Sequence, residues 1–167
     1  MAWLAKRYDV EGRTSLAGGQ LSISLSTKSP FDNEGDGHYC RRTYKRMAHA
    51  FARLERLDGG RRIADAMRLH PALIGGTGQL DSQLMTAFPG LVAKGGAEGL
   101  LCLVTAGGIG IALKSRDGNP RPHRTAINLV FERLGVGELP ESLLQSHVRN
   151  SRNEISGSLS GNWPEPV

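Results

Sequence analysis

Apolar residues are densest between Leu91 and Lys114, where short apolar runs alternate with glycine pairs. The pattern predicts three strands, over Leu91 to Lys94, Leu100 to Thr105 and Ile109 to Lys114. A tight glycine corner separates the first two, and a Gly107-Gly108 turn separates the last two. This stretch therefore predicts the centre of a sheet whose strands run antiparallel.

Helical spacing dominates on either side of these strands. From Thr43 to Leu57 the apolar residues recur at three- and four-residue steps, and Asp58-Gly59-Gly60 would end that helix. Similar spacing predicts helices over Arg61 to Leu69, Asp81 to Ala87, Arg121 to Leu134 and Pro140 to Val148. Thr77 or Asp81 is expected to cap the short helix before the strands. Helices around an antiparallel sheet define an α+β fold class.

The chain before Thr43 is harder to assign. Leu21, Ile23 and Leu25 alternate with serines, which predicts one half-buried strand between loop-like stretches. At the other end, residues around Glu154 to Leu159 predict an edge strand. We expect residues 1 to 42 to be poorly organised and residues 43 to 167 to form the domain proper.

Length and composition indicate a single light-cored domain. The 167 residues are 39% hydrophobic and 22% charged, but they include 22 glycines and few aromatic side chains. No apolar run is long enough to cross a bilayer, and no apolar signal core follows Lys6-Arg7. We therefore expect a cytoplasmic protein with no membrane partner.

No metal or other cofactor is predicted. Cys40 and Cys102 have no zinc-site spacing, and Cys102 is expected to be a buried reduced thiol. The acidic stretch 32–37 lacks the glutamate that ends a calcium loop. Gly75-Gly76-Thr77-Gly78 lacks the lysine and hydroxyl residue of a phosphate-binding loop.

The net charge of +5 leaves open an acidic partner. Arginines are frequent between Arg41 and Arg68, but acidic residues are interspersed and aromatic residues for base stacking are scarce. A solvated helix face is therefore favoured over a nucleic-acid site. If a partner binds, the candidate residues are Arg41, Arg42, Arg53, Arg61 and Arg62.

Lys94 is a cation among apolar and small residues at the end of a predicted buried strand. A buried ammonium must be paired with an acid or lose its proton. Such a lysine can orient a substrate or act as a base. The alternative is a strand-end lysine that extends its amine to solvent.

The Lys94-Gly95-Gly96 corner resembles the Lys-x-Gly strand motif of serine beta-lactamases and penicillin-binding proteins. The motifs around it are His70-Pro71, Gly75-Gly76-Thr77-Gly78, Asp81, Leu84-Met85, Pro89-Gly90, Ala93 to Gly99, Gly110 to Lys114 and Asp117-Gly118. Together they look like the C-terminal half of the bacterial asparaginase II family, the rhizobial thermolabile type. The resemblance runs from about Met47 to about Gly135 and implies a partial serine beta-lactamase-like fold.

That resemblance implies hydrolysis of the side-chain amide of L-asparagine to aspartate and ammonia, through an acyl-enzyme on an activated serine. It makes Lys94 a catalytic lysine that serves as base or proton relay. Gly95, Gly96 and Ala97 would leave bare backbone beside the substrate, where their amides would support an oxyanion. Glu98 would contact the substrate or pair with an arginine or with Lys94.

The nucleophile of the family pattern is missing. Family members resemble serine beta-lactamases in carrying Ser-x-x-Lys, which places the two side chains one helical turn apart. The residues three positions before Lys6, Lys28, Lys45, Lys94 and Lys114 are Trp3, Leu25, Arg42, Leu91 and Ile111. We therefore expect a truncated member with little or no asparaginase activity on its own.

Two further interpretations stay open. Residues 1 to 42 depart from the family pattern, and one hypothesis is that a shifted or unrelated reading frame encodes them. The other interpretation is a non-catalytic binding or assembly module that complements an N-terminal fragment or binds an acidic partner. A half-scaffold would leave apolar faces uncovered, so homo-oligomers are also expected.

Overall fold

The computed structural model describes residues 7–17, 20–28, 37–115, 117–144 and 147–162. Its strands are β1 (Arg7–Ala17), β2 (Gln20–Lys28), β3 (Val92–Gly96), β4 (Leu100–Val104), β5 (Gly110–Ser115), β6 (His147–Arg149), β7 (Ile155–Ser158) and β8 (Ser160–Asn162). Its helices are α1 (Gly37–Ala52), the 3₁₀ helix η1 (Leu54–Arg56), α2 (Gly60–Leu69), α3 (Pro71–Gly75), α4 (Leu80–Ala87), α5 (His123–Leu134) and α6 (Glu141–Leu144). The acidic stretch 32–37 lies almost wholly outside the described residues.

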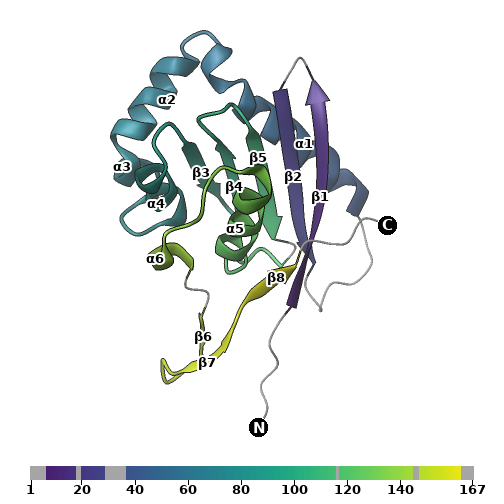
Figure 1. Ribbon diagram of the computed structural model, residues 1–167, viewed down its shortest axis with the longest axis vertical. Coiled ribbons are helices and arrows are strands. Elements are labelled where there is room, and N and C mark those ends of the chain that lie inside the picture. The colour runs from purple at the N-terminus through teal and green to yellow at the C-terminus, as the bar shows by residue number, and fades with distance from the viewer. Residues whose placement is uncertain (1–6, 18–19, 29–36, 116, 145–146, 163–167) are drawn as a thin grey trace.

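The main sheet has the strand order β3-β4-β5-β2-β1-β8 (Figure 1). The neighbours β3, β4 and β5 are antiparallel, which confirms the predicted centre and the α+β class. Beyond β5 the sheet becomes mixed, because β2 lies parallel to β5 and β8 lies parallel to β1. Where one strand was predicted near Leu21 to Leu25, the backbone forms the hairpin β1–β2.

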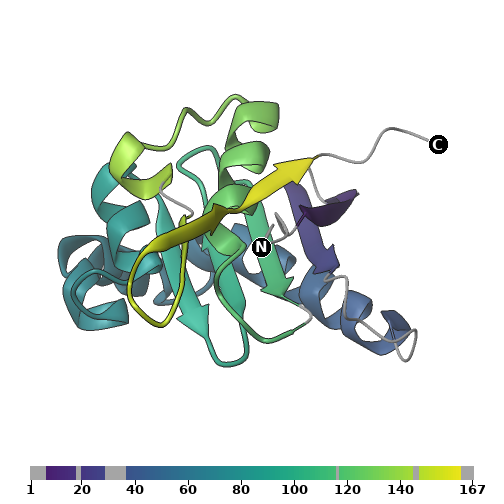
Figure 2. The same cartoon turned by 90° about the horizontal axis from the view of Figure 1, so that it is seen from below.

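Helices cover both faces of the sheet, as Figures 1 and 2 show. Along β4, Leu101 and Leu103 pack in the core cluster that includes α4 and α5 residues. Cys102 and Val104 point to the opposite face, where residues of α1 and α2 cover them. The period-two alternation of a strand thus builds two cores from one apolar run.

Helix α1 lies unusually close to the sheet at Gly110, the first residue of β5. A Cβ at Gly110 would lie 2.0 Å from the Ala48 carbonyl oxygen and 2.8 Å from the Ala52 Cβ. Ala48 and Ala112 are fully buried at this contact. Small residues on both elements are therefore what allows α1 to approach β5.

On the other face, α5 supplies the largest part of the core. Ile127, Val130 and Phe131 are fully buried, and the Phe131 ring meets Phe88 edge to face at 5.0 Å. The helix ends as predicted at Gly135, which adopts the left-handed conformation with φ of 63°.

Several boundaries differ from the predictions. The first predicted helix begins earlier, at Gly37, and its last turn is replaced by η1. His70 ends α2 as predicted, but Pro71 also begins α3, because the fixed φ of proline suits the first position of a helix. After α6, the predicted last helix gives way to β6.

The predicted C-terminal strand forms as β7 and is followed by β8. Strands β6 and β7 pair as a separate two-stranded sheet that extends from the body (Figure 1). None of the described helices is long and apolar enough to cross a membrane. Cys102 is a free buried thiol as predicted, and burial raises its pKa to about 11.

Candidate active site

Lys94 lies on β3, the edge strand of the sheet, opposite Cys102 of β4. Its amine donates a hydrogen bond to the carbonyl oxygen of Gly95, and 48% of its side chain is exposed. The prediction of a buried ammonium is therefore wrong. Val92 and Ala93, which precede Lys94 on the same strand, are fully buried, so the burial of β3 ends at Lys94.

The acid that Lys94 faces is Asp81, in the first turn of α4. The Asp81 side chain is only 4% exposed, and its Oδ2 lies 3.8 Å from the Lys94 Nζ. Oδ2 also accepts the Gly95 amide hydrogen at 2.8 Å, and Oδ1 accepts the Ser82 amide hydrogen at 2.9 Å. The carboxylate therefore ties the start of α4 to β3 at the position of Lys94.

Asp81 is the residue of this site whose role the sequence analysis missed. It was expected to cap a helix, with Thr77 as the alternative, but the helix begins after Gln79 with no side-chain cap. As the second residue of α4, it instead directs its carboxylate across to the strand. The signal available in the sequence was an acidic residue near the start of a predicted helix. Its bonding partner on β3 is determined only by the tertiary fold.

The glycine run 75–78 packs directly on this carboxylate. A Cβ at Gly75 would lie 1.9 Å from Oδ1 of Asp81, so only glycine leaves room for it. The next turn needs φ of 100° at Gly76 and 79° at Gly78, a region that other residues rarely adopt. Three motifs that are separate in the sequence therefore meet at Lys94.

This arrangement holds a lysine amine between solvent and a fixed acid. Asp81 is buried and accepts hydrogen bonds from two backbone amides, which fix the position of its carboxylate. The amine of Lys94 remains accessible and can donate to a polar group of a substrate. The Gly95 amide is already paired with Asp81, so this member of the three expected oxyanion donors has a partner within the chain.

Ala97 and Glu98 belong to a second polar cluster, at the turn between β3 and β4. Glu98 and Gly99 have φ of 55° and 66°. The Lys114 amine donates to the Glu98 carbonyl oxygen, and to that of Ser115 at 3.0 Å. Within the described residues, the contact given for Glu98 is the one between its carbonyl oxygen and Lys114, and the expected roles of its carboxylate stay predictions.

His123, the first residue of α5, completes this cluster. Its Nε2 lies 2.9 Å from the Gly99 carbonyl oxygen, which also accepts the Ser115 amide hydrogen at 2.9 Å. Nε2 must carry the proton because its partner can only accept. Burial lowers the pKa of His123, with the nearby Lys114 acting in the same direction. The cluster thus fixes the turn that follows the Lys94 corner, and the sequence analysis gave no sign of it.

Serines near these clusters are not available as nucleophiles. The Ser82 hydroxyl donates to the Pro71 carbonyl oxygen at 2.8 Å, in a residue that is buried. Ser115 is fully buried, and its Oγ has no hydrogen-bond partner in the described part of the chain. Neither hydroxyl can meet a substrate where it lies.

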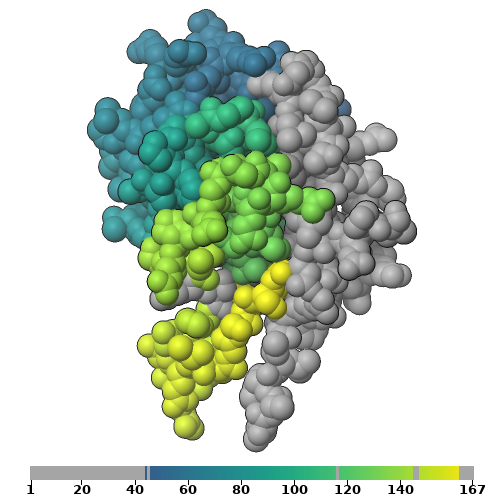
Figure 3. All heavy atoms as spheres, in the orientation of Figure 1, coloured from purple at the N-terminus to yellow at the C-terminus, as the bar shows by residue number. Residues whose placement is uncertain are grey.

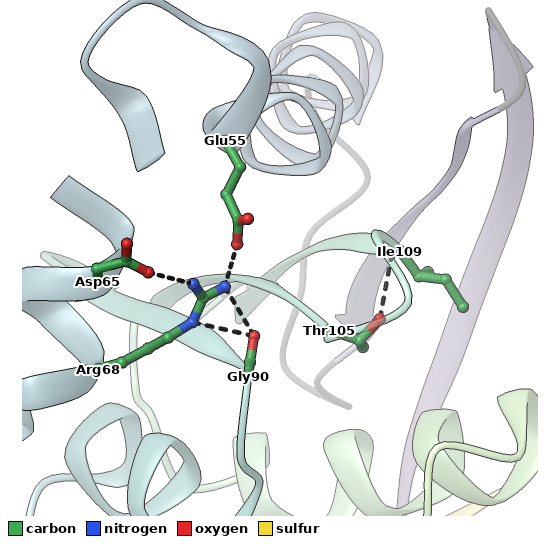
Figure 4. A network of polar contacts seen from close by, with 6 residues as sticks. All are labelled: Glu55, Asp65, Arg68, Gly90, Thr105 and Ile109. Atoms are coloured by element: carbon green, nitrogen blue, oxygen red, sulfur yellow. Dashed lines mark hydrogen bonds and ion pairs between the residues drawn. The ribbon is translucent and has the colours of Figure 1, made fainter. Parts of the chain in front are cut away.

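Arg68 fixes the beginning of β3 (Figure 4). Its guanidinium donates to the Gly90 carbonyl oxygen through Nε at 3.2 Å and Nη2 at 2.8 Å. It also pairs with Asp65 at 3.1 Å and with Glu55 of η1. The entry to the strand that carries Lys94 is thereby tied to η1 and α2. Within the described residues, no three His, Cys, Asp or Glu side chains gather as a metal site would need.

Fold and site together define an α+β protein with a lysine and a buried acid at the edge of its sheet. A comparison with protein families matches residues 38–161 to L-asparaginase II, which is most of the chain. The chain belongs to this family, which gives it an asparaginase-family function and an amide substrate like asparagine. The match extends on both sides beyond the stretch from Met47 to Gly135 that carried the resemblance. A search of curated proteins found no match.

Proposed function

We propose that this chain supplies the lysine side of an amidohydrolase site that cleaves L-asparagine to L-aspartate and ammonia. The observation that carries the proposal is the arrangement of Asp81, Gly95 and Lys94 within a chain of the L-asparaginase II family. Lys94 is the catalytic lysine, and Asp81 is a positioning residue that acts through it. The wider fold is that of a partial serine beta-lactamase-like scaffold in a cytoplasmic protein.

Hydrolysis through an acyl-enzyme needs a proton carrier beside the attacking group and donors for the developing oxyanion. The accessible amine of Lys94 serves as the proton carrier. Of the backbone amides at the corner, those of Gly96 and Ala97 are the donors that this proposal assigns to the substrate oxygen, since the Gly95 amide binds Asp81. Glu98 would then act by holding the turn in place, through its carbonyl contact with Lys114.

The attacking serine is the part that these 167 residues do not provide. The sequence has no Ser-x-x-Lys, and the hydroxyls of Ser82 and Ser115 are buried. The proposal therefore assigns the nucleophile to a complementing chain with the N-terminal half of the family pattern. This sequence on its own would have little or no activity, because losing a nucleophile costs several orders of magnitude in rate.

The first test incubates the purified chain with L-asparagine and follows ammonia release, alone and after mixing with the N-terminal half of a complete family member. We expect background rates from the chain alone and restored turnover in the mixture. Turnover by the chain alone at an ordinary enzymatic rate would show that the nucleophile lies within it. No turnover from any mixture that forms a stable complex would contradict the assignment.

The second test assigns the lysine in the active mixture. Lys94→Met is expected to lower kcat by about 100-fold or more, the usual contribution of a proton-transfer group. Lys94→Arg keeps the charge but cannot carry the proton and should be similarly impaired. Arg152→Met, which removes an exposed cation from the loop between β6 and β7, is the control and should leave kcat unchanged.

A further inference from the structure

Exposed large apolar side chains concentrate on one part of the molecule. Among the described residues, four of the six such side chains lie between residues 57 and 73. We call these four, Leu57, Ile63, Leu69 and Leu73, the α2–α3 face. Leu69 is 73% exposed and Leu73 is 83% exposed. These four residues fall within one stretch of 17 residues, and exposed apolar side chains gathered in this way mark interaction surfaces more often than single exposed leucines do.

The exposure follows from how α2 packs. Helix α2 buries Gly60 and Ala64 against the molecule, and Ala64 contributes to the core cluster with Val92 and Val104. Leu69 falls on the opposite side of the same helix, because it lies five residues after Ala64, which is about 140° around the axis. Leu73 follows on α3, after the turn at Pro71. Figure 3 shows these elements at the outer edge of the molecule.

The stretch of sequence that leads into this face carries most of the excess positive charge. Between Gly37 and Leu69 the sequence has nine Lys and Arg and three Asp and Glu, a net charge of +6. The whole chain has 21 basic and 16 acidic residues, a net charge of +5, so the rest of the chain is at −1. Of the nine cations, Arg53, Arg56, Arg61 and Arg62 are exposed in the segment from residue 53 to residue 62.

Ion pairs within the chain engage acidic residues near the α2–α3 face. Two of the acids, Glu55 and Asp65, are both engaged by Arg68. The first turn of α2 has no acidic residue and carries Arg61 and Arg62, both exposed, at the positive end of the helix dipole. A carboxylate placed at this end of the helix would be favourable for both the arginines and the dipole, and the nearest acid in the chain is the exposed Asp58, just before the helix.

We propose that the α2–α3 face binds an acidic amphipathic segment of a partner protein. Apolar side chains of the segment would cover Leu69 and Leu73, and its carboxylates would pair with Arg61 and Arg62. A second copy of this chain fits less well, because its own arginines would lie against these. Nucleic acid would satisfy the arginines but not the leucines, which offer no stacking surface for bases. This proposal does not depend on the catalytic one.

The test uses the full chain and defined peptides, with binding followed by fluorescence anisotropy. The probe is a synthetic helical peptide with leucines at positions i, i+3, i+4 and i+7 and glutamates elsewhere. A scrambled peptide of the same composition and the lysine counterpart of the probe are controls. We expect saturable binding of the acidic helix alone, weakened by salt because the charges are exposed.

Matched variants locate the binding surface. Ile63→Ser and Ile155→Ser remove the same side chain at 56% and 57% exposure, but only the first lies on the α2–α3 face. We expect Ile63→Ser and Leu73→Ser each to weaken binding about tenfold and Ile155→Ser to leave it unchanged. The charge reversal Arg62→Glu is expected to weaken binding and its salt dependence, whereas Arg152→Glu is not.

Three outcomes would overturn the proposal. One is that no acidic amphipathic peptide binds at low salt. Another is that a DNA or RNA oligonucleotide of equal charge binds as tightly as the acidic peptide and keeps its affinity in Leu73→Ser, which would make the face a nucleic-acid site. The third is a dimer in sedimentation experiments that Leu73→Ser dissociates, which would show that a second copy covers the face.

Discussion

Replacing Asp81 by alanine removes the link between α4 and β3. The carboxylate accepts two backbone N–H bonds, from Gly95 at 2.8 Å and from Ser82 at 2.9 Å. A hydrogen bond to a charged group contributes about 1.5–3 kcal/mol, and the Gly95 amide would be left without its acceptor. The pair with Lys94 adds less than about 1 kcal/mol, because that lysine is half exposed. We therefore expect Asp81→Ala to lower the free energy of unfolding by about 3 kcal/mol.

The measurement is urea unfolding followed by circular dichroism, with amide hydrogen exchange of Gly95 as the local readout. The Gly95 amide should exchange faster in Asp81→Ala because its acceptor is lost. The exchange rate of the Leu103 amide, in the interior of the sheet, should change only as much as the global free energy of unfolding changes. Asp117→Ala is the matched control, because Asp117 accepts one backbone N–H at 3.0 Å in an exposed turn. We expect it to cost less than about 1 kcal/mol.

Gly75→Ala tests the same contact from the other side. The new methyl would lie within 1.9 Å of the Asp81 Oδ1 and displace the carboxylate, so its cost should not add to that of Asp81→Ala. A loss of less than about 1 kcal/mol in Asp81→Ala, with unchanged exchange at Gly95, would refute the assigned role. Fully additive losses in the double variant would refute the contact with Gly75.

Two further predictions concern other parts of the fold. Burial lowers the pKa of His123 in the folded protein below its usual 6.5, so the unfolded chain binds this proton more readily. The free energy of unfolding should therefore fall as the pH drops from about 6.5 toward the pKa of the folded state. The decrease is at most about 1.4 kcal/mol per pH unit. Urea unfolding midpoints measured from pH 7.5 to 5 should decline less in His123→Gln than in the unmodified protein. His70→Gln, which replaces an exposed histidine, should keep the full decline. Equal pH dependence of the midpoint in the two variants would refute the prediction. Gly110→Ala should destabilise by about 3 kcal/mol, because its methyl would meet the Ala48 carbonyl at 2.0 Å and overpack the contact. Thermal melts should show no such loss for Gly107→Ala, whose nearest neighbour is 3.8 Å away; equal melting temperatures for both would contradict the close approach of α1.

Local patterns predicted the elements that are amphipathic over several turns or strongly apolar. Strands β3, β4 and β5 and helix α5 begin and end within two residues of their predicted limits. The reason is that their apolar residues form continuous runs or recur at helical spacing. The short elements between and after these were predicted less well. The 3₁₀ helix η1, helix α3 and strand β6 are short, and packing and a single proline decide their conformation.

The lysine of the candidate site was visible in the sequence, but its surroundings were not. Lys94 and its glycines stand out by composition and by family resemblance. The residues before Lys94 on β3 are fully buried while Lys94 is half exposed, and this change along one strand depends on what the rest of the chain packs against it. That Asp81 binds the strand as well as the first turn of α4 depends on how α3 and α4 pack on β3.

By itself, then, the sequence determined the class of fold, the apolar centre and the family, because these depend on residue types and their spacing along the chain. The tertiary structure alone decided which distant groups meet. It brought Gly75 and Asp81 to Lys94, set Lys114 and His123 on the neighbouring turn, and left Leu69 and Leu73 facing solvent. The physical reason is that burial and pairing are properties of the packed chain, and no local pattern specifies them.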